Sequence, residues 1–383
     1  MENMDINISH LFDRVYKDKK VFITGDTGFK GSWLALWLNA MGADVYGFSL
    51  PPKSLKDNFV TTNLDTTIHH QDGDIRDFTF LREQLNKIQP DFVFHLAAQP
   101  LVLESYQNPH YTFETNLMGT VNVFEAVRSV PSVKVVLNIT SDKCYKNIES
   151  NDGYKETDPM GGKDPYSASK GCSELITNAY YNSFFNSGNN LCKVASVRAG
   201  NVIGGGDWAD NRIVPDFFRS VQSKKDLVIR NSYSVRPWQH VLEPLSGYLL
   251  TSAGLYLQSI ESGEGWNFGP SSNNNITVVE LIEKMIAISG FGNYKVESEK
   301  TKPYESKLLK LDISKVKEYL KWNPVLTLDE TIEFTVDGYL AEIEKKNIYQ
   351  NRIEQITKYI NLANTRNLDW AKQISTYSEM STI

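Results

Sequence analysis

The feature that most constrains the fold of this 383-residue chain is a set of glycines directly behind a short apolar run. The run is 21–23, the glycines are Gly25, Gly28 and Gly31, and an apolar helical pattern follows at 33–41. Between a strand and a helix, this spacing is typical of a dinucleotide-binding loop: the glycines allow a tight turn, close approach of a pyrophosphate, and close helix packing. Because glycines also occur in ordinary turns, the prediction of a dinucleotide-binding loop depends on the position of this set between a strand and a helix.

Short apolar runs alternate with amphipathic stretches through the first half of the chain. Runs rich in Val, Ile and Phe are typical of strands buried on both faces, and they occur at 21–23, 45–48, 92–96, 133–139 and 194–197. Helices are expected between them, for example at 33–41 and 117–127. This order predicts an α/β fold with a doubly wound parallel Rossmann sheet, whose ligands bind beyond the carboxyl ends of the strands.

The domain prediction follows from where this alternation weakens. Residues 20–198 are expected to form the Rossmann domain, after an N-terminal extension at 1–19. Residues 199–341, which glycines and prolines interrupt, are expected to form a smaller, interleaved C-terminal substrate lobe. Late elements near 236–270 should return to the sheet, with 265–269 as a strand. Residues 342–383 are left as a C-terminal extension without an assigned role.

Composition excludes several classes of function. A net charge of −6 argues against a nucleic-acid partner, because phosphate binding normally needs a basic surface. Cys144, Cys172 and Cys192 form no Cys-x-x-Cys pair, which predicts a reduced, cytoplasmic protein and no metal site. No apolar run is long enough for a membrane span, and the first residues lack a signal-peptide core.

Tyr166 and Lys170 form the pattern Tyr-x-x-x-Lys, which places both side chains on one helix face. A phenol has a pKa of about 10, and a neighbouring cation lowers it, so the pair predicts a base that takes a hydroxyl proton while a hydride leaves the same carbon. Tyr16 and Lys20 show the same spacing, but nothing around them resembles a site. The strand expected to end at Ile139 precedes Tyr166, and this context favours the pair Tyr166 and Lys170.

Thr140-Ser141-Asp142-Lys143 follows that strand, so a hydroxyl, an acid and an amine lie at its carboxyl end. One reading is an ordinary turn in which Asp142 caps a helix. The other is a catalytic cluster, which we favour because Tyr166 belongs to the same region of the predicted fold.

These motifs resemble the extended short-chain dehydrogenase/reductases, and within them the sequence is similar to the CDP-glucose 4,6-dehydratases. The matching stretches are 27–34, 95–100, 140–145, 159–162, 164–171, 198–208, 236–241 and 266–270. Lys143 stands where related dTDP-glucose and GDP-mannose dehydratases have Glu, which is the pattern of the CDP-glucose branch. Asp26 departs from the histidine common in the family, and its effect is expected to be small because it flanks the pyrophosphate loop.

The resemblance implies NAD-dependent oxidation of CDP-glucose at carbon 4, loss of water across carbons 5 and 6, and hydride return to carbon 6. Tyr166 is then the base, and Lys170 holds the nicotinamide ribose and lowers the Tyr166 pKa. Ser141 hydrogen-bonds the carbon 4 oxygen, and Asp142 is the acid for the departing hydroxyl. Lys143 is either a neutral base, which we favour, or a charged stabiliser of the enolate.

The cofactor residues that we predict are Gly25, Thr27, Gly28, Phe29, Lys30, Gly31, Asp74, Ile75, Leu96, Ala97, Ala98, Asn116, Thr140, Tyr166 and Lys170. The segment after the second strand, 49–53, has no acid for a ribose 2′-OH, and Lys53 could touch a 2′-phosphate, so this position leaves NAD and NADP open. The predicted substrate residues are Gln99, Ser141, Asn201, Arg212, Arg230, Arg236 and Trp238. Arginines also occur as ordinary surface residues. We interpret His69-His70 as a solvated strand end and His95 as a satisfied core residue.

Two other functions stay open. The first is a dehydratase or epimerase for another nucleotide sugar on the same fold, and the second is a non-catalytic NAD(H)-binding regulator. Ser141, Asp142, Tyr166 and Lys170 together argue against the regulator. The resemblance also implies a homodimer or homotetramer, without a nucleic-acid or membrane partner, that serves deoxysugar synthesis for O-antigen or a related surface polysaccharide.

Overall fold

The computed structural model describes residues 7–372, apart from 151, 187–191, 230, 231, 233, 272–274 and 298–308. Its centre is a seven-stranded sheet in the order β11-β6-β5-β4-β1-β2-β3, with every neighbouring pair parallel. The strands are β1 Lys20–Thr24, β2 Asp44–Ser49, β3 His69–Asp72, β4 Phe92–His95, β5 Val135–Ile139, β6 Lys193–Ala199 and β11 Gly265–Phe268. The predicted α/β class with a parallel, doubly wound sheet is confirmed.

Helices cover both faces of the sheet, which explains why its strands are continuously apolar. Successive side chains of a strand point to opposite faces, so Val21 and Ile23 of β1 join one core cluster and Phe22 joins another. On the first face lie α1 Phe29–Ala40 and α9 Leu242–Tyr256, and on the second lie α3 Phe78–Ile88, α6 Gly119–Arg128 and α7 Pro165–Tyr180. Shorter helices are α2 Asn58–Thr61, α4 Val102–Gln107, α5 Pro109–Phe113 and α11 Ser314–Tyr319.

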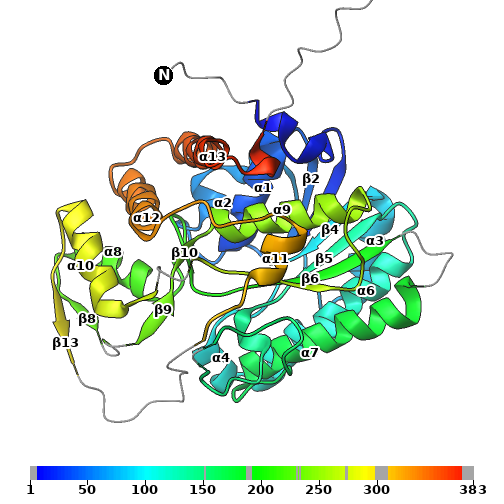
Figure 1. Ribbon diagram of the computed structural model, residues 1–383, viewed down its shortest axis with the longest axis horizontal. Helices are drawn as coiled ribbons and strands as arrows, with labels where there is room; N and C mark the ends of the chain where they lie inside the picture. The colour runs from blue at the N-terminus through cyan, green and yellow to red at the C-terminus, as the bar shows by residue number, and fades with distance from the viewer. Residues whose placement is uncertain are drawn as a thin grey trace, which may run out of the picture.

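A second lobe, built mostly from the chain after β6, lies beside the sheet on the left of Figure 1. It holds α8 Ile213–Ser223, α10 Val278–Ser289 and the strand pairs β7 Val202–Ile203 with β10 Gln239–His240, β9 Val235–Pro237 with β12 Asn275–Thr277, and β8 Leu227–Ile229 with β13 Tyr294–Val296. Its own core contains Phe217, Phe218, Leu281 and Met285. β11 then lies beside β6, which brings the chain back into the main sheet.

Two long helices, α12 Leu328–Ile343 and α13 Ile348–Thr365, lie near the end of the described chain and are followed by a short 3-10 helix, Asp369–Ala371. Residues of α12 contribute to the cores of both lobes, and α13 packs against α1 through the rings of Tyr359 and Trp37. Figure 1 shows α12 between the second lobe and α13. The residues after 342 are therefore part of the fold as far as 372, and the rest of the predicted extension, 373–383, lies outside the described residues. In the part of the chain that the structure describes, no helix combines the length and apolarity of a membrane span.

Candidate active site

The strand order reverses direction between β1 and β4, which are neighbours in the sheet. In open parallel sheets this switch point leaves a crevice beyond the carboxyl ends of the strands, where ligands bind. Three of the predicted motifs meet at this edge. They are the glycine loop after β1, residues 96–98 after β4, and residues 140–143 after β5.

The glycine loop is packed too tightly for larger residues. Gly25 has φ +83°, and a Cβ there would lie 2.7 Å from Ala97 N, while a Cβ at Gly31 would lie 2.0 Å from Gly25 O. Thr27 Oγ1 donates to Leu50 O (2.9 Å), which ties the loop to the end of β2. Within the described chain no side chain caps the start of α1, so its first N–H groups are left for a ligand to bind. The geometry fits a dinucleotide pyrophosphate.

The predicted catalytic residues converge at the end of β5. Asp164 caps α7 by accepting from Ser167 N (2.9 Å), so Tyr166 lies in the first turn of the helix. Ser141 lies between the phenol and the acid: hydrogen bonding from Ser141 acts to lower the pKa of Tyr166, and the Ser141 hydroxyl donates to Asp142 Oδ1 (2.9 Å). Tyr166, Ser141 and Asp142 are all buried.

A glycine makes room for the acid of this cluster. A Cβ at Gly200, just after β6, would lie 1.9 Å from Asp142 Oδ2. Lys143, which follows Asp142 in the sequence, is half-buried in the short 3-10 turn Asp142–Cys144. The carboxylate is therefore held in one place, between the end of β5 and the end of β6.

The charges in this cluster differ from the sequence-based expectation. Burial raises the pKa of Tyr166 to about 12, while the Ser141 hydrogen bond and the Arg212 charge lower it. Burial lowers the pKa of Lys170 to about 8, although the charge of Glu174 raises it. The balance at Tyr166 thus differs from the expected one: loss of water outweighs the neighbouring charges, and Arg212 is a cation that lowers the pKa of the phenol.

A buried ion pair that the sequence interpretation missed lies behind the cluster. Glu174 follows Lys170 by one helical turn and pairs with Arg198 of β6 through contacts of 2.7 and 2.8 Å. It also accepts from Ser196 Oγ (2.6 Å) and from the Thr140 hydroxyl. The predicted cofactor residue Thr140 thus turns its side chain inward. The spacing Tyr-x-x-x-Lys-x-x-x-Glu was the available signal, because it repeats the same helix face.

Two predicted ligand residues are used inside the protein instead. The Gln99 amide donates to Leu101 O (3.1 Å) and accepts from Leu101 N (2.6 Å), so it shapes its own loop rather than facing the sugar. Asn116 accepts from Gln99 N (2.7 Å) and donates to Ser169 Oγ (2.9 Å). Both amides brace the loop after β4 against α7, which corrects the prediction that they contact ligands.

Asp26 and His70 also differ from expectation. The Asp26 side chain is completely buried beneath the glycine loop, where it contacts His70 Nδ1 (2.6 Å) and accepts from Ser49 Oγ (2.9 Å). Burial alone would lower the pKa of His70, but Asp26 and Asp72 raise it above its ordinary value. His70 is therefore not a solvated strand end. His95, by contrast, is a buried residue satisfied by Thr24 Oγ1 (2.8 Å) and Thr120 Oγ1, as expected.

The other predicted cofactor residues differ in burial and in their partners. Leu96, Ala97 and Ala98 are half-buried after β4, and Phe29 is half-buried at the start of α1. The carboxylate of Asp74 is paired with Arg76 (2.6 Å), and Ile75 is buried.

Lys30 is close to the catalytic cluster rather than to the loop alone. Burial lowers its pKa to about 8, against the charge of Asp142, and Arg212 and Lys170 lower it further.

Tyr16, of the second Tyr-x-x-x-Lys pattern, lies in the core, and its hydroxyl donates a hydrogen bond to Leu249 O (2.5 Å).

The predicted substrate residues of the second lobe are less uniform. Arg212 is half-buried and pairs with Asp207 (2.8 Å), which raises its pKa. Asn201 and Arg236 are half-buried, whereas the ring of Trp238 belongs to the lobe's core and is not free to stack on a base. Arg230 lies outside the described residues. Among those residues, no cluster of acids, histidines and cysteines could hold a metal ion.

A parallel sheet of this order, with a glycine loop at its switch point and a Tyr-x-x-x-Lys helix beside a strand-end Ser-Asp pair, defines an extended short-chain dehydrogenase/reductase. The sequence matches the GDP-mannose 4,6 dehydratase family over residues 22–335. It is 47% identical over 354 residues to the CDP-glucose 4,6-dehydratase of Salmonella typhimurium, which covers 92% of this chain and 98% of that one. The chain therefore belongs to the family of sugar-nucleotide 4,6-dehydratases.

Solved structures share the fold. An epimerase from Methanothermobacter thermautotrophicus aligns with a TM-score of 0.74 and 24% identity over 88% of this chain and 96% of that one. A dTDP-glucose 4,6-dehydratase from Bacillus anthracis, solved in complex with NAD, aligns with a TM-score of 0.71 and 21% identity over 86% and 99%. At these identities the likeness concerns the fold.

Proposed function

We propose that this chain is an NAD-dependent CDP-glucose 4,6-dehydratase, which converts CDP-glucose into CDP-4-dehydro-6-deoxyglucose and water. The observation that carries the proposal is the convergence of Ser141, Asp142, Tyr166 and Lys170 at one end of the crevice, with Arg212 acting on the same phenol. The relationship to the Salmonella typhimurium enzyme supports the choice of nucleotide sugar.

The crevice is suited to the cofactor. The close-packed loop from Gly25 to Gly31 and the start of α1 would hold the pyrophosphate. In the described chain the Lys170 ammonium makes one long hydrogen bond, 3.4 Å to Ile139 O, so it keeps donors for the ribose hydroxyls. When bound, NAD⁺ supplies the hydride acceptor for sugar carbon 4 and returns that hydride to carbon 6.

The side chains would handle the protons of the reaction. Tyr166 takes the proton of the carbon 4 hydroxyl, whose oxygen Ser141 holds by a hydrogen bond. The resulting ketone acidifies the carbon 5 proton, which Lys143 removes as a neutral base. Asp142 gives a proton to the carbon 6 hydroxyl, which leaves as water. This division explains why an acid and an amine stand at the end of β5 next to the Tyr166 base.

The second lobe would hold the nucleotide end. Arg212 suits a pyrophosphate because a guanidinium offers two parallel donors, and Asp207 fixes it at the start of α8. Asn201, Arg230 and Arg236 are the other candidates. We assign Trp238 no stacking role, because its ring is buried in the lobe's core.

We also propose a homodimer or homotetramer in the cytoplasm, without a nucleic-acid or membrane partner. Exposed apolar side chains on neighbouring helices α4 and α7, namely Leu103, Tyr106 and Leu175, offer an apolar surface for a second copy. In the described chain Cys144 and Cys172 are free thiols, which suits a reducing compartment. The product would serve deoxysugar synthesis for O-antigen or a related surface polysaccharide.

The test is to incubate the protein and NAD with CDP-, dTDP-, GDP- and UDP-glucose and follow 4-keto-sugar formation by NMR. Turnover should be highest with CDP-glucose. Isomer formation without loss of water would instead establish an epimerase, and NAD binding without turnover would establish a regulator. Tyr166→Phe should lower kcat by about 10²–10⁴-fold, because the base is lost while the ring still packs.

A further inference from the structure

We propose that Arg352 of α13 is a positioning residue for the nucleotide sugar. In this view it fixes the loop 204–212, and through that loop the guanidinium of Arg212, in the shape that receives the substrate's phosphates. The inference rests on the proposed function, which supplies the ligand of Arg212. It gives a role to the region after residue 342, which lies beyond the family match at 22–335.

Arg352 is completely buried and is held from several sides. Its Nε donates to Asn58 Oδ1 (2.9 Å) and its Nη1 to Gly338 O (3.2 Å), while Nη2 pairs with Glu342. The guanidinium also lies 5.3 Å from the centre of the Trp33 ring. Burying an arginine is costly unless each donor finds a partner, so this position is tightly specified.

The loop 204–212 is in direct contact with this arginine. A Cβ at Gly205 would lie 2.7 Å from Arg352 Nη1 and 2.8 Å from Nη2, so the guanidinium packs directly against this glycine. Trp33 Nε1 donates to Gly205 O (3.0 Å) on the other side. The partner of Arg352, Glu342, uses its second oxygen to accept from Trp208 Nε1 (2.6 Å). Arg352 thus holds the loop at two points.

The same loop carries the arginine proposed to bind phosphate. The Asp207 carbonyl accepts from the Tyr339 hydroxyl, and the Asp207 carboxylate pairs with Arg212 Nη1 (2.8 Å). A contiguous chain therefore runs from Arg352 through Glu342 and the Asp207-Trp208 peptide to Arg212. Its far end lies at the catalytic site, because the charge of Arg212 lowers the pKa of Tyr166.

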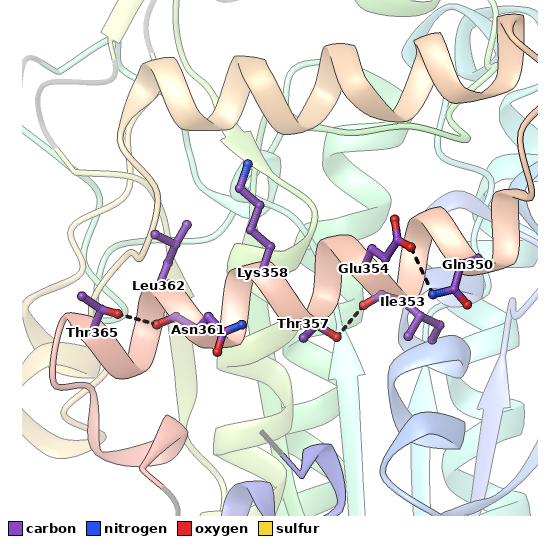
Figure 2. Close-up of a pocket in the computed structure, with 8 residues that line it drawn as sticks. All are labelled: Gln350, Ile353, Glu354, Thr357, Lys358, Asn361, Leu362 and Thr365. Atoms are coloured by element: carbon purple, nitrogen blue, oxygen red, sulfur yellow. Dashed lines mark hydrogen bonds between the residues drawn. The ribbon is translucent and has the colours of Figure 1, made fainter. Parts of the chain in front are cut away.

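Three variants test the inference. Arg352→Met keeps a long apolar stem but removes the charge and its donors, and Trp208→Phe keeps a ring but removes the bond to Glu342. Lys358→Met is the matched control: it removes a cation from the same helix, on the exposed face that Figure 2 shows along a surface groove. KM for CDP-glucose, kcat and the Kd of NAD are measured below the melting temperature of every variant.

Arg352→Met should raise KM for CDP-glucose by about 3- to 30-fold, the range expected for coupling along a packed network, with kcat and the NAD Kd close to wild type. Trp208→Phe should raise KM by less, and the double variant should show less than the product of the two effects, because both act through one chain. Lys358→Met should leave KM unchanged. If Arg352→Met does not fold, Trp208→Phe and its KM decide the question.

The inference fails if the arginine or tryptophan variant lowers the melting temperature while KM stays at the wild-type value, because that is the result of a purely structural role. It also fails if kcat falls at constant KM. Failure of the proposed function looks different, because the unmodified protein would then produce no keto sugar from CDP-glucose at all.

Discussion

Two buried carboxylates, Glu174 behind the catalytic cluster and Asp26 in the glycine loop, have different partners. Glu174, behind the catalytic cluster, pairs with Arg198 and accepts from Ser196 Oγ (2.6 Å). Asp26, beneath the glycine loop, pairs with His70 and accepts from Ser49 Oγ (2.9 Å). An arginine keeps its charge at every physiological pH, whereas a histidine titrates. The carboxylate behind the catalytic cluster therefore has a partner of fixed charge, Arg198, and the carboxylate of the glycine loop has a titratable partner, His70.

The elements that each pair connects explain this difference. Glu174 and Arg198 join α7 to β6, so they hold the helix that carries Tyr166 and Lys170 against the strand beside β5. Asp26 belongs to the loop itself, and His70 joins it to β3 at the edge of the sheet. A change in the first pair should therefore disturb the whole active site, and a change in the second should act mainly on the loop.

The largest effect is expected from Arg198→Met. It leaves Glu174 buried without its cation, and breaking such a pair costs about 3–5 kcal/mol of the free energy of unfolding. Urea unfolding at neutral pH measures the loss. Arg198→Met with Glu174→Leu is the control, because replacing both partners with apolar residues should recover most of the stability. A single variant within about 1 kcal/mol of wild type would show that the pair does not hold α7 in place.

A smaller effect is expected from His70→Phe. The ring keeps its bulk beside Phe59, but Asp26 loses its partner, and an unsatisfied buried group costs about 1–3 kcal/mol. The cost should be lower than for Arg198→Met because His70 contacts Asp26 through one ring nitrogen, whereas Arg198 donates two hydrogen bonds to Glu174. The same unfolding assay, with His69→Phe on the exposed neighbour as control, measures it. Equal losses from His70→Phe and Arg198→Met would contradict the comparison.

The parts of the molecule that sequence predicted correctly are those with local signals. The apolar runs placed β1, β2, β4, β5 and β6, and helix spacing put Tyr166 and Lys170 on one face of α7. The glycine loop was readable because its three glycines meet a strand end and a helix start. Hydrophobic periodicity and turn preferences depend on residues that are close together in the sequence, so they can be recognised from the sequence alone.

The residues that were misread depend on distant partners. His70 belongs to the polar strand His69–Asp72, and it is half-buried only because Asp26, 44 positions earlier, reaches it. The Gln99 amide looked free for a sugar, but Leu101 and Thr112 use it. Arg352 meets Asn58 across 294 positions, which no pattern along the chain could indicate. Such pairings follow from the packed fold rather than from any local rule.

The smallest expected effect, and the one that separates the two pairs most directly, is the dependence of stability on pH. The pKa of His70 is raised in the folded protein, so its contribution is fully present below the unfolded value of 6.5 and is lost as pH rises through the folded value. The pKa of Glu174 is lowered despite its burial, because Arg198 and its hydrogen bonds outweigh that burial. Its contribution is lost only in acid.

As pH rises above the unfolded histidine value of 6.5, the His70 pair should therefore lower the stability of the protein, and the Glu174 pair should leave it unchanged. Burial also raises the pKa of Glu243 to about 7, so this residue too makes the protein less stable as pH rises. The pH dependence of the wild type alone therefore does not identify the contribution of His70. The informative quantity is the difference between wild type and His70→Phe, measured by urea unfolding at several pH values. That difference should shrink as pH rises, whereas the difference between wild type and the Arg198→Met, Glu174→Leu double variant should stay constant, because the wild-type pair keeps its charges and the double variant has neither group. A constant difference for His70→Phe would mean that the imidazole is neutral throughout and that both pairs are equally insensitive to pH.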